Sequence, residues 1–476
     1  MIFSSLEFLL LFLPGTLIVH FLLPRKLRNY WLLLASLFFY AWGEPTFVLI
    51  MIASVCFNYL LALGIDRYPQ QRTRKLLLVL DIVLNLGILL VFKYLNFLTS
   101  TLHSLIPGTV SLFPATSIAL PIGISFFTFQ ALSYVVDVYR HNAKAERNIA
   151  FVGLYISLFP QLIAGPIVRY TTIMDQIRER KITLSGFSDG MIRFMTGFNK
   201  KVLLANVLAT VADTAFKSNG GSVSMAWLGA LCYTLQFYFD FSGYSDMAIG
   251  LGRMLGFRFL ENFDHPYISR TVTEFWRRWH ISLGTWFRDY VYFPLGGSRV
   301  SSKLRLVRNL LVVWLLTGIW HGANWTFILW GVLYGVVIIV EKLAGIPKKL
   351  PSWPVVCRVL YRIVTILIVM LGWVLFRADD LPKAGAYLQT MFGLGGAPLV
   401  ADDFIFNVRE YAVYWAAGIL CSVPVLQWLQ GRLQRIGGRT EAVLTQGAQL
   451  VQLVLFVVSV TMLVMNAHNP FIYFNF

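Results

Sequence analysis

The chain has 476 residues, of which 57% are hydrophobic and 13% are charged, and its formal net charge is +17. Soluble domains carry about 25% charged residues, so this composition excludes an ordinary soluble protein and indicates a polytopic membrane protein. Lys and Arg are concentrated in short loops between apolar runs, which topology explains more simply than nucleic-acid binding. The four cysteines stand singly without CxxC spacing, so neither a disulfide framework nor a zinc site is predicted.

Apolar runs of membrane-spanning length recur along the whole chain, since a helix needs roughly 20 apolar residues to cross about 30 Å of hydrocarbon. The first run is followed, rather than preceded, by basic residues. This is the reverse of a cleavable signal peptide, so we expect a retained helix with its N-terminus outside the cytoplasm. The predicted segments are 1–23, 30–42, 47–65, 76–98, 121–138, 148–168, 187–215, 225–252, 309–340, 359–376, 412–430 and 447–468.

The charges of the loops predict the orientation of these segments. The Lys- and Arg-rich loops are expected to be cytoplasmic, whereas loop 99–120, without Lys or Arg, and the acidic loop 379–410 are expected outside, as are both termini. Segments 148–168 and 309–340 have basic residues at both ends, and 253–308 is too polar to cross simply. Some segments must therefore re-enter the membrane or lie flat, which is tolerated only inside protein or beside a wet cavity.

Large apolar side chains recur with helical spacing between residues 275 and 290, with basic residues mostly off this stripe. From composition alone, the simplest interpretation is an interfacial helix whose basic residues face phospholipid headgroups. His280 lies at the edge of the stripe. A lone histidine in such a place is more often structural than catalytic.

His321 and Asn324 interrupt the apolar run 316–330. An ionisable residue at membrane depth is a functional hypothesis by default, and histidine is a natural general base near neutral pH. The alternative is a neutral imidazole hydrogen-bonded to a neighbouring helix. Asp240 and Asp246 lie in an apolar helix near three glycines, a pattern that fits an ion site, a packing seam or the wall of a catalytic cavity.

Several catalytic motifs are absent from the sequence. It contains no G-x-S-x-G elbow, no Walker A loop and no HExxH, so a P-loop enzyme or a metal hydrolase is disfavoured and no metal site is predicted. A transporter function is not excluded by these absences and is kept as an alternative.

Two blocks, EFWRRWHISLGTWFRDYVYFPLGGSR (274–299) and WHGANW (320–325), resemble the signature blocks of the bacterial membrane-bound O-acyltransferases. LPIGISFFTFQALSYVVDVYR (120–140), LFPQLIAGPIVRY (158–170) and residues 238–269 carry the same resemblance, which is nearest to the alginate-type branch and weakest over 390–450. It implies one integral domain over 1–476 with a signature core at about 120–340. The implied fold is all-α and polytopic: a ring of about 11–12 tilted transmembrane and re-entrant helices around a thinned core with a through-tunnel.

The resemblance also implies roles for particular residues. His321 matches the family's central histidine and would act as general base, and His280 would position the thioester or stabilise the oxyanion. Candidates for the tunnel or the donor site are Trp276, Arg277, Arg278, Trp279, Arg288, Asp289, Trp320, Asn324, Trp325, Asp240 and Asp246.

The implied enzyme lies in a bacterial inner membrane and binds no cofactor. It would take an acetyl group from a cytoplasmic thioester, acetyl-coenzyme A. The acceptor would be a hydroxyl of an extracytoplasmic polysaccharide, with alginate as the leading candidate, or a hydroxyl of a periplasmic partner protein. Membrane lipid is the other expected partner, and nucleic acid is not. The alternatives are D-alanyl transfer to teichoic acid, a polysaccharide or small-anion transporter whose basic vestibule gathers substrate, and an inactive scaffold.

Overall fold

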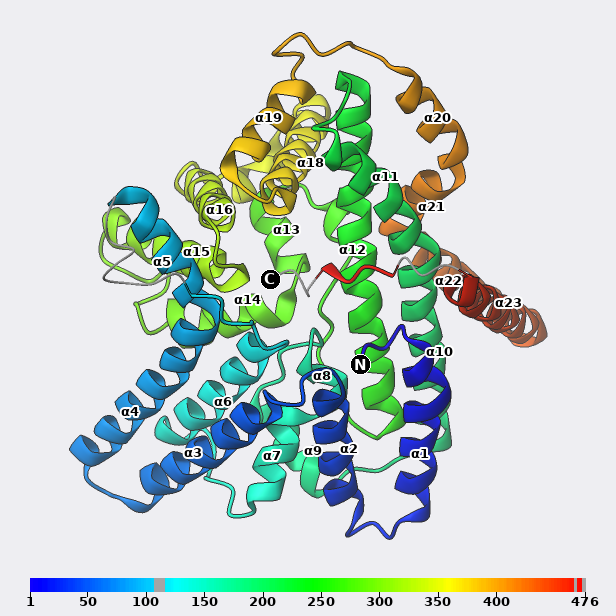
Figure 1. Ribbon diagram of the computed structural model, residues 1–476. Coiled ribbons are helices and arrows are strands. Elements are labelled where there is room, and N and C mark those ends of the chain that lie inside the picture. Colours follow the sequence, from blue (N-terminus) through cyan, green and yellow to red (C-terminus); the bar gives the residue numbers. More distant parts are fainter. Residues whose placement is uncertain (107–115, 466–468, 473–476) are drawn as a thin grey trace. The chain divides into compact units, whose positions relative to one another are not determined.

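The computed structural model of the chain describes residues 1–106, 116–465 and 469–472 (Figure 1). These residues fold into helices, with no β-strand among them, which confirms the prediction of an all-α protein. The predicted outer loop 99–120 and the end of the predicted segment 447–468 extend into residues outside this description.

The helices form two compact units. The first comprises Met1–Phe194 and Met247–Leu260, and the second comprises Met195–Asp246 and Glu261–Phe476. The division falls within two long helices, α10 (Leu184–Asn199) and α12 (Val223–Met254), each of which supplies residues to both units. A single membrane domain over the whole chain stays a prediction.

The first unit contains short and long helices with apolar faces. In it, α3 and α4 pack on each other and on α6. Its helical elements are η1 (Phe8–Phe12), α1 (Leu13–Leu22), α2 (Arg28–Gly43), α3 (Val48–Arg67), α4 (Gln71–Leu89), η2 (Leu90–Tyr94), α5 (Leu95–Leu105), α6 (Ile124–Tyr139), α7 (Ile149–Ser157), α8 (Phe159–Leu162) and α9 (Tyr170–Arg178).

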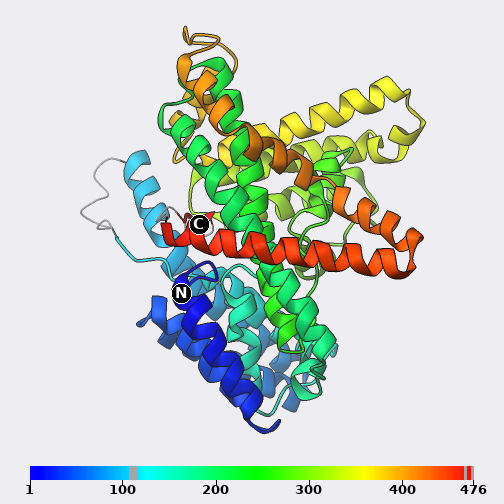
Figure 2. The ribbon, with the colours of Figure 1, turned by 90° about the vertical axis from the view of Figure 1, so that its right-hand side faces the viewer.

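The second unit carries both predicted signature blocks. In Figure 2, its last long helix, α23, runs back from the end of α22, and the two helices are in contact. Its elements are η4 (Lys200–Ala205), α11 (Asn206–Lys217), η5 (Pro266–Ile268), α13 (Val272–Arg278), α14 (Ile281–Phe287), η6 (Arg288–Tyr292), α15 (Lys303–His321), α16 (Trp325–Leu343), α17 (Ile346–Lys349), η7 (Leu350–Ser352), α18 (Val355–Arg377), α19 (Leu381–Met391), α20 (Asp402–Glu410), α21 (Ala412–Ser422), α22 (Val425–Ile436) and α23 (Gly438–Met465).

Five helical stretches of the described chain are long and apolar enough to cross a bilayer, or six if a bent pair counts as one span. This confirms a multi-pass membrane protein. The five are Val48–Arg67, Gln71–Leu105, Trp325–Leu343, Val355–Arg377 and Thr440–Met465, and the bent pair is Ala412–Ser422 with Gln427–Arg435.

Four predicted helices are broken in the structure, and one of them, segment 412–430, is divided between α21 and α22. Segment 148–168 is divided between α7 and the one-turn helix α8, with the non-helical Leu158 between them. In the turn after α8, a Cβ on Gly165 would lie 2.5 Å from the Cα of Gln161, so only glycine fits there. The stripe over 275–290 is divided between α13 and α14. Segment 309–340 is two helices, α15 and α16, that pack on each other as a hairpin.

The hairpin explains why basic residues flank both ends of segment 309–340. Its two helices approach closely at glycines: a Cβ on Gly318 would lie 2.5 Å from the carbonyl oxygen of Phe327, and one on Gly331 would lie 2.5 Å from that of Trp314. Small residues at such a crossing let two helix backbones pack tightly. The two outer ends of the hairpin therefore lie together, which a single spanning helix would not allow.

Candidate functional site

The turn of the α15–α16 hairpin positions His321, the last residue of α15. Asn324 fixes this turn, since its Oδ1 accepts a hydrogen bond from the backbone N–H of Thr326 at 3.1 Å and its Nδ2 donates to the carbonyl of Asp379 at 2.6 Å. An asparagine that caps a helix in this way satisfies an otherwise orphaned backbone donor. Asn324 therefore acts on the backbone that carries His321.

The imidazole of His321 lies among aromatic rings and is only 4% exposed. Its ring centroid is 4.8 Å from that of Trp320, 4.9 Å from Trp330 and 5.2 Å from Phe376, each in an edge-on arrangement. Trp330 comes from α16 and Phe376 from α18. Three helices thus enclose His321 in an apolar environment.

His280 lies at the break between α13 and α14, with a left-handed backbone (φ +44°). Left-handed backbone is uncommon for residues other than glycine and often marks a functional site. His280 is 2% exposed, and its ring and that of Phe241 of α12 are nearly perpendicular, with centroids 4.7 Å apart.

The hydrogen bonds around Asn262 determine which nitrogen of His280 carries the proton. Asn262 Oδ1 accepts from the backbone N–H of Ser282 at 3.2 Å and from the Ser282 hydroxyl at 2.9 Å, so this atom is the amide oxygen. His280 Nδ1 lies 3.1 Å from the same oxygen and must donate to it. Burial lowers the pKa of His280 to about 3, which keeps the ring neutral. Its Nε2, which has no partner among the described residues, is therefore a hydrogen-bond acceptor.

Trp320 connects the two histidines. Its indole ring lies 5.9 Å from the imidazole of His280 and 4.8 Å from that of His321, centroid to centroid. The sequence separates these histidines by forty-one positions, and the fold brings both against one side chain. The prediction that His280 and His321 belong to one site therefore has a geometric basis.

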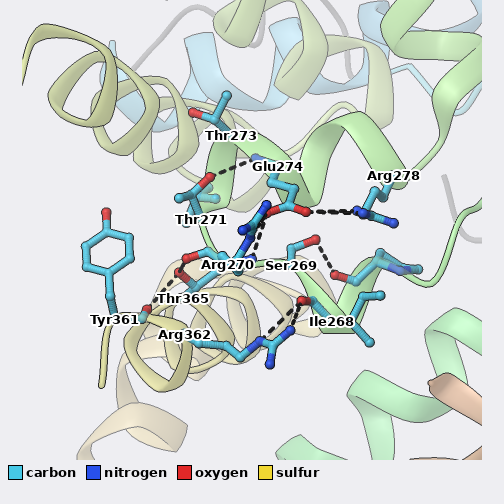
Figure 3. A network of polar contacts seen from close by, with 12 residues as sticks. Ile268, Ser269, Arg270, Thr271, Thr273, Glu274, Arg278, Tyr361, Arg362 and Thr365 are labelled. Atoms are coloured by element: carbon cyan, nitrogen blue, oxygen red, sulfur yellow. Dashed lines mark hydrogen bonds and ion pairs between the residues drawn. The ribbon is translucent and has the colours of Figure 1, made fainter. Parts of the chain in front are cut away.

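A polar network holds the start of α13, the helix that precedes His280 (Figure 3). Thr271 Oγ1 accepts the backbone N–H of Glu274 at 3.0 Å, and Glu274 is ion-paired with both Arg270 and Arg278. Figure 3 shows Arg362 and Thr365, both from α18, directed at the backbone carbonyls of Ile268 and Arg270. These contacts attach α13 to α18.

Glu341 of α16 adds a buried carboxylate to this attachment. It is 1% exposed and accepts the backbone N–H groups of Val272 and Thr273, each at 2.8 Å, and the hydroxyl of Tyr361 at 3.0 Å. A carboxylate at a helix N-terminus is favourable because the unpaired N–H groups there carry partial positive charge. The sequence analysis did not select Glu341, because this residue stands at the end of an apolar run, directly before Lys342, where charged residues are ordinary.

Three of the four tryptophans predicted for the tunnel, Trp276, Trp279 and Trp320, lie in the aromatic cluster of the second unit. Trp276 contacts Trp330 at 5.3 Å and Trp373 at 6.1 Å, and Trp279 contacts Trp373 at 4.9 Å. The fourth, Trp325, is 48% exposed, and its role in a tunnel stays a prediction.

The predicted arginines have other surroundings. Arg278 is paired with Asp264 at 2.7 Å as well as with Glu274, and Arg288 pairs with its neighbour Asp289 at 2.9 Å. Arg277 is exposed and forms no ion pair with any described residue. Their roles at a donor site stay predictions, and Arg278 in particular has a clear structural role at α13.

Asp240 and Asp246 are both ion-paired. Asp240 binds buried Lys201 at 2.6 Å and also accepts the backbone N–H of Ile472 at 2.9 Å, while Asp246 binds Lys200 at 2.6 Å. Lys201 also donates to the carbonyl of Pro470. The Asp240–Lys201 pair therefore holds the segment 469–472 against α12 and η4.

Sequence reasoning did not select Asn262, Trp330, Trp373 or Phe376. Asn262 lies within residues 238–269, which carry the family resemblance, but nothing in the sequence distinguishes this asparagine from its polar neighbours. The three aromatic residues are ordinary members of apolar helices, and only the packing of α16 and α18 brings them to His321.

The fold and site define a multi-pass, all-helical membrane protein with two buried histidines among aromatic side chains of its second unit. The model of the membrane-bound O-acyltransferase family matches residues 34–346, and the chain belongs to this family. It is therefore a membrane acyltransferase.

Three similar proteins from bacteria each cover most or all of the chain. A "Probable alginate O-acetylase AlgI" of Azotobacter vinelandii is 47% identical over 83% of this chain and 79% of its own. A protein of the same name from Pseudomonas putida is 41% identical over the full length of both chains. A "Peptidoglycan O-acetyltransferase" of Helicobacter pylori is 35% identical over 86% of this chain and 84% of its own.

Proposed function

We propose that this enzyme O-acetylates an extracytoplasmic polysaccharide, with alginate as the first candidate. The observation that carries the proposal is the contact of both His280 and His321 with Trp320 in a buried aromatic site. The names of the relatives support an acetyl group and a polymer acceptor, since these relatives are called alginate O-acetylase and peptidoglycan O-acetyltransferase.

His321 is the proposed general base. It removes the proton of the acceptor hydroxyl while that oxygen attacks the carbonyl carbon of the acetyl thioester. Collapse of the tetrahedral intermediate breaks the carbon–sulfur bond, and the proton held by His321 passes to the departing thiolate. The products are an acetyl ester and a free thiol, so His321 returns to its neutral form.

His280 is proposed to position the donor or the acceptor. Its neutral ring donates through Nδ1 to Asn262, so its Nε2 accepts a hydrogen bond and offers none. This favours the first of its two predicted roles, positioning the thioester, because an oxyanion requires a donor. An amide N–H of the donor or the acceptor hydroxyl would supply the proton for this bond.

The proposed donor to the oxyanion is the indole N–H of Trp330. This nitrogen is buried and has no acceptor among the described residues, and the ring contacts His321. A donor that is already oriented in an apolar site stabilises developing charge more than water does. The surrounding tryptophans also exclude water, which protects the thioester from hydrolysis.

Acetyl-coenzyme A is the proposed donor, from the cytoplasm, and the bacterial inner membrane is the proposed location. The acceptor is either the polysaccharide itself or a hydroxyl of a periplasmic partner that completes the transfer. These assignments rest on the resemblance of the two signature blocks and on the basic loops.

The experiment uses the purified protein in lipid nanodiscs with acetyl-labelled coenzyme A. Alginate oligosaccharides, peptidoglycan fragments and candidate periplasmic proteins are offered separately, and His103→Ala serves as a histidine control outside the site. Transfer of label to one acceptor, lost in His321→Ala and kept in His103→Ala, is the expected result. Absence of donor binding and of transfer, with a D-alanyl carrier protein serving instead, would overturn the acetyl assignment.

A further inference from the structure

Basic groups from separate segments meet within the first unit, at the ends of α1, α2 and α9. Asn29 joins these segments: its Nδ2 donates to the carbonyl of Ile177 at 2.7 Å, and its Oδ1 accepts from Arg180 Nη1 at 2.6 Å. Arg28 precedes Asn29 in the chain, so the two arginines come from neighbouring positions of the fold. None of these residues takes part in the proposed acetyl transfer.

Arg180 is held in one orientation by its surroundings. Its Nε donates to the carbonyl of Leu255 at 2.9 Å, and its guanidinium carbon lies 4.2 Å from the ring centroid of Phe257. Its Nη2 has no acceptor and its charge has no carboxylate partner among the described residues. Burial, with the charge of Arg28 adding to it, lowers the pKa of Arg180 to about 10.

Arg28 and His20 also have nitrogen atoms without hydrogen-bond partners among the described residues. Arg28 donates through Nε to the carbonyl of Leu23 at 3.1 Å and through Nη2 to that of Phe21 at 3.3 Å, which leaves Nη1 without a described acceptor. His20 is 0% exposed, and neither of its ring nitrogens has a hydrogen-bond partner among the described residues. The charges of Arg180 and Arg28 both act on this ring.

The acidic residues nearby do not balance this charge. Glu146 is paired with Arg178 at 2.7 Å, and the exposed Glu179 forms no ion pair within the described chain. A partly buried guanidinium without a counter-ion is costly. An anion that fills the free N–H groups of both arginines would remove this cost.

We propose that Arg28, Arg180 and His20 bind the phosphate of an anionic phospholipid headgroup. Planar guanidinium groups suit phosphate oxygens, to which they donate charge-assisted hydrogen bonds. We take lipid as the source because apolar side chains beside the cluster are exposed: Phe21 is 40%, Leu22 80% and Leu27 48% exposed. The acyl chains of the same lipid would cover these side chains.

General attraction of basic loops to an acidic membrane surface is the competing explanation. Lys26 provides the matched control, since it is a basic residue of the same loop, exposed and without a hydrogen bond or ion pair among the described residues. Surface attraction predicts that Lys26 and Arg28 contribute alike. A specific binding site predicts that lipid binding depends on the oriented guanidinium groups of Arg28 and Arg180 and not on Lys26.

The test measures binding of phosphatidylglycerol and phosphatidylcholine to the delipidated, full-length protein by native mass spectrometry, with Tm as a folding check. We expect a preference for phosphatidylglycerol that Arg28→Gln and Arg180→Gln each weaken roughly tenfold, as for loss of one charged hydrogen bond. Lys26→Gln should keep the preference. If Arg180→Gln lowers the Tm of the lipid-free protein, the test rests on Arg28→Gln and His20→Phe, each of which should weaken the preference for phosphatidylglycerol.

Three results would overturn the proposal. The first is equal binding of the two lipids, and the second is an equal loss in Lys26→Gln and Arg28→Gln, which indicates surface attraction. The third is displacement of phosphatidylglycerol by inorganic phosphate or by coenzyme A at matching concentration, which assigns the cluster to a soluble phosphate. Because lipid binding is measured without turnover, failure here leaves the proposed acetyl transfer unaffected.

Discussion

Asn262 fixes the tautomer of His280, because its amide oxygen accepts a hydrogen bond from His280 Nδ1 at 3.1 Å while it also accepts two from Ser282. The free Nε2 of His280 is thereby made an acceptor in a buried site. In the proposed mechanism the two histidines therefore have different tasks, and that of His280 depends on a partner eighteen positions away in the sequence.

Replacement of Asn262 should alter the pH dependence of turnover. With a pKa of about 3, His280 is neutral throughout the usual assay range, so it contributes no acidic limb there. Asn262→Asp places a carboxylate against Nδ1–H, which favours the imidazolium and raises the pKa of His280. A protonated Nε2 no longer accepts, so kcat should fall as the pH is lowered through the raised pKa.

The pH–rate profile of Asn262→Asp measures this shift directly, with Asn262→Ala as the neutral comparison. Asn262→Ala should lower kcat by about 10- to 100-fold, the usual effect of removing a residue that orients a reacting group. A merely structural role would lower the Tm of both variants and leave their pH profiles the same as that of the native enzyme.

Trp330→Phe should separate the aromatic contact from the indole N–H. Phenylalanine keeps a ring beside His321 but removes the buried donor, so kcat should fall by about 10²- to 10³-fold while donor affinity changes little. Steady-state kinetics with a separate donor-binding measurement check this. If Trp330→Phe retains native kcat, the oxyanion is stabilised by another group.

Gly318→Ala should destabilise the α15–α16 hairpin. The added Cβ would lie 2.5 Å from the carbonyl oxygen of Phe327, and such overpacking costs about 1–3 kcal/mol. Gly87→Ala is the matched control, because this helical glycine has nothing within 4 Å of its Cβ position. A clear drop in Tm is expected only for Gly318→Ala, and equal Tm values would contradict the close helix approach.

Loss of either member of the Asp240–Lys201 pair should cost more than loss of both. Asp240→Leu leaves a buried ammonium without its carboxylate, at a cost of about 3–5 kcal/mol, whereas the double variant with Lys201→Met removes both charges. Thermal unfolding of the two single variants and the double variant measures the coupling. A double variant that is as unstable as the sum of the singles would show that the ion pair contributes no coupling.

Much of the helical architecture was predictable, and the exceptions have physical reasons. The long helix predicted over 225–252 corresponds to α12, since its apolar run is continuous. The basic residues at both ends of segment 309–340 predicted that some segments re-enter, which fits the hairpin. The place of its turn, at Gly322 and Asn324, was not predicted because this turn is short and has apolar residues on both sides. The stripe over 275–290 keeps helical spacing across His280, so the left-handed residue at the break left no signal in the pattern.

The sequence predicted the histidines and several tryptophans of the candidate site, but it did not predict the residues that contact them. His321 was selected because an ionisable residue is conspicuous in an apolar run, and His280 because it lies in a block that resembles a family signature; the catalytic roles of both stay predictions. Glu341, Asn262, Trp330 and Phe376 could not be found in the same way. Their proximity to α13 or to the histidines arises from the packing of α16 and α18 and from the loop that precedes α13.

The central claim is that His321 removes the proton from the acceptor hydroxyl. Single-turnover transfer of label from acetyl-coenzyme A to the accepted polymer, in nanodiscs, tests it most directly in His321→Ala beside His103→Ala. We predict that His321→Ala lowers the transfer rate by about 10²- to 10⁴-fold, the usual contribution of a general base, with unchanged Tm and donor affinity. Transfer at the native rate by a folded His321→Ala protein would contradict the account.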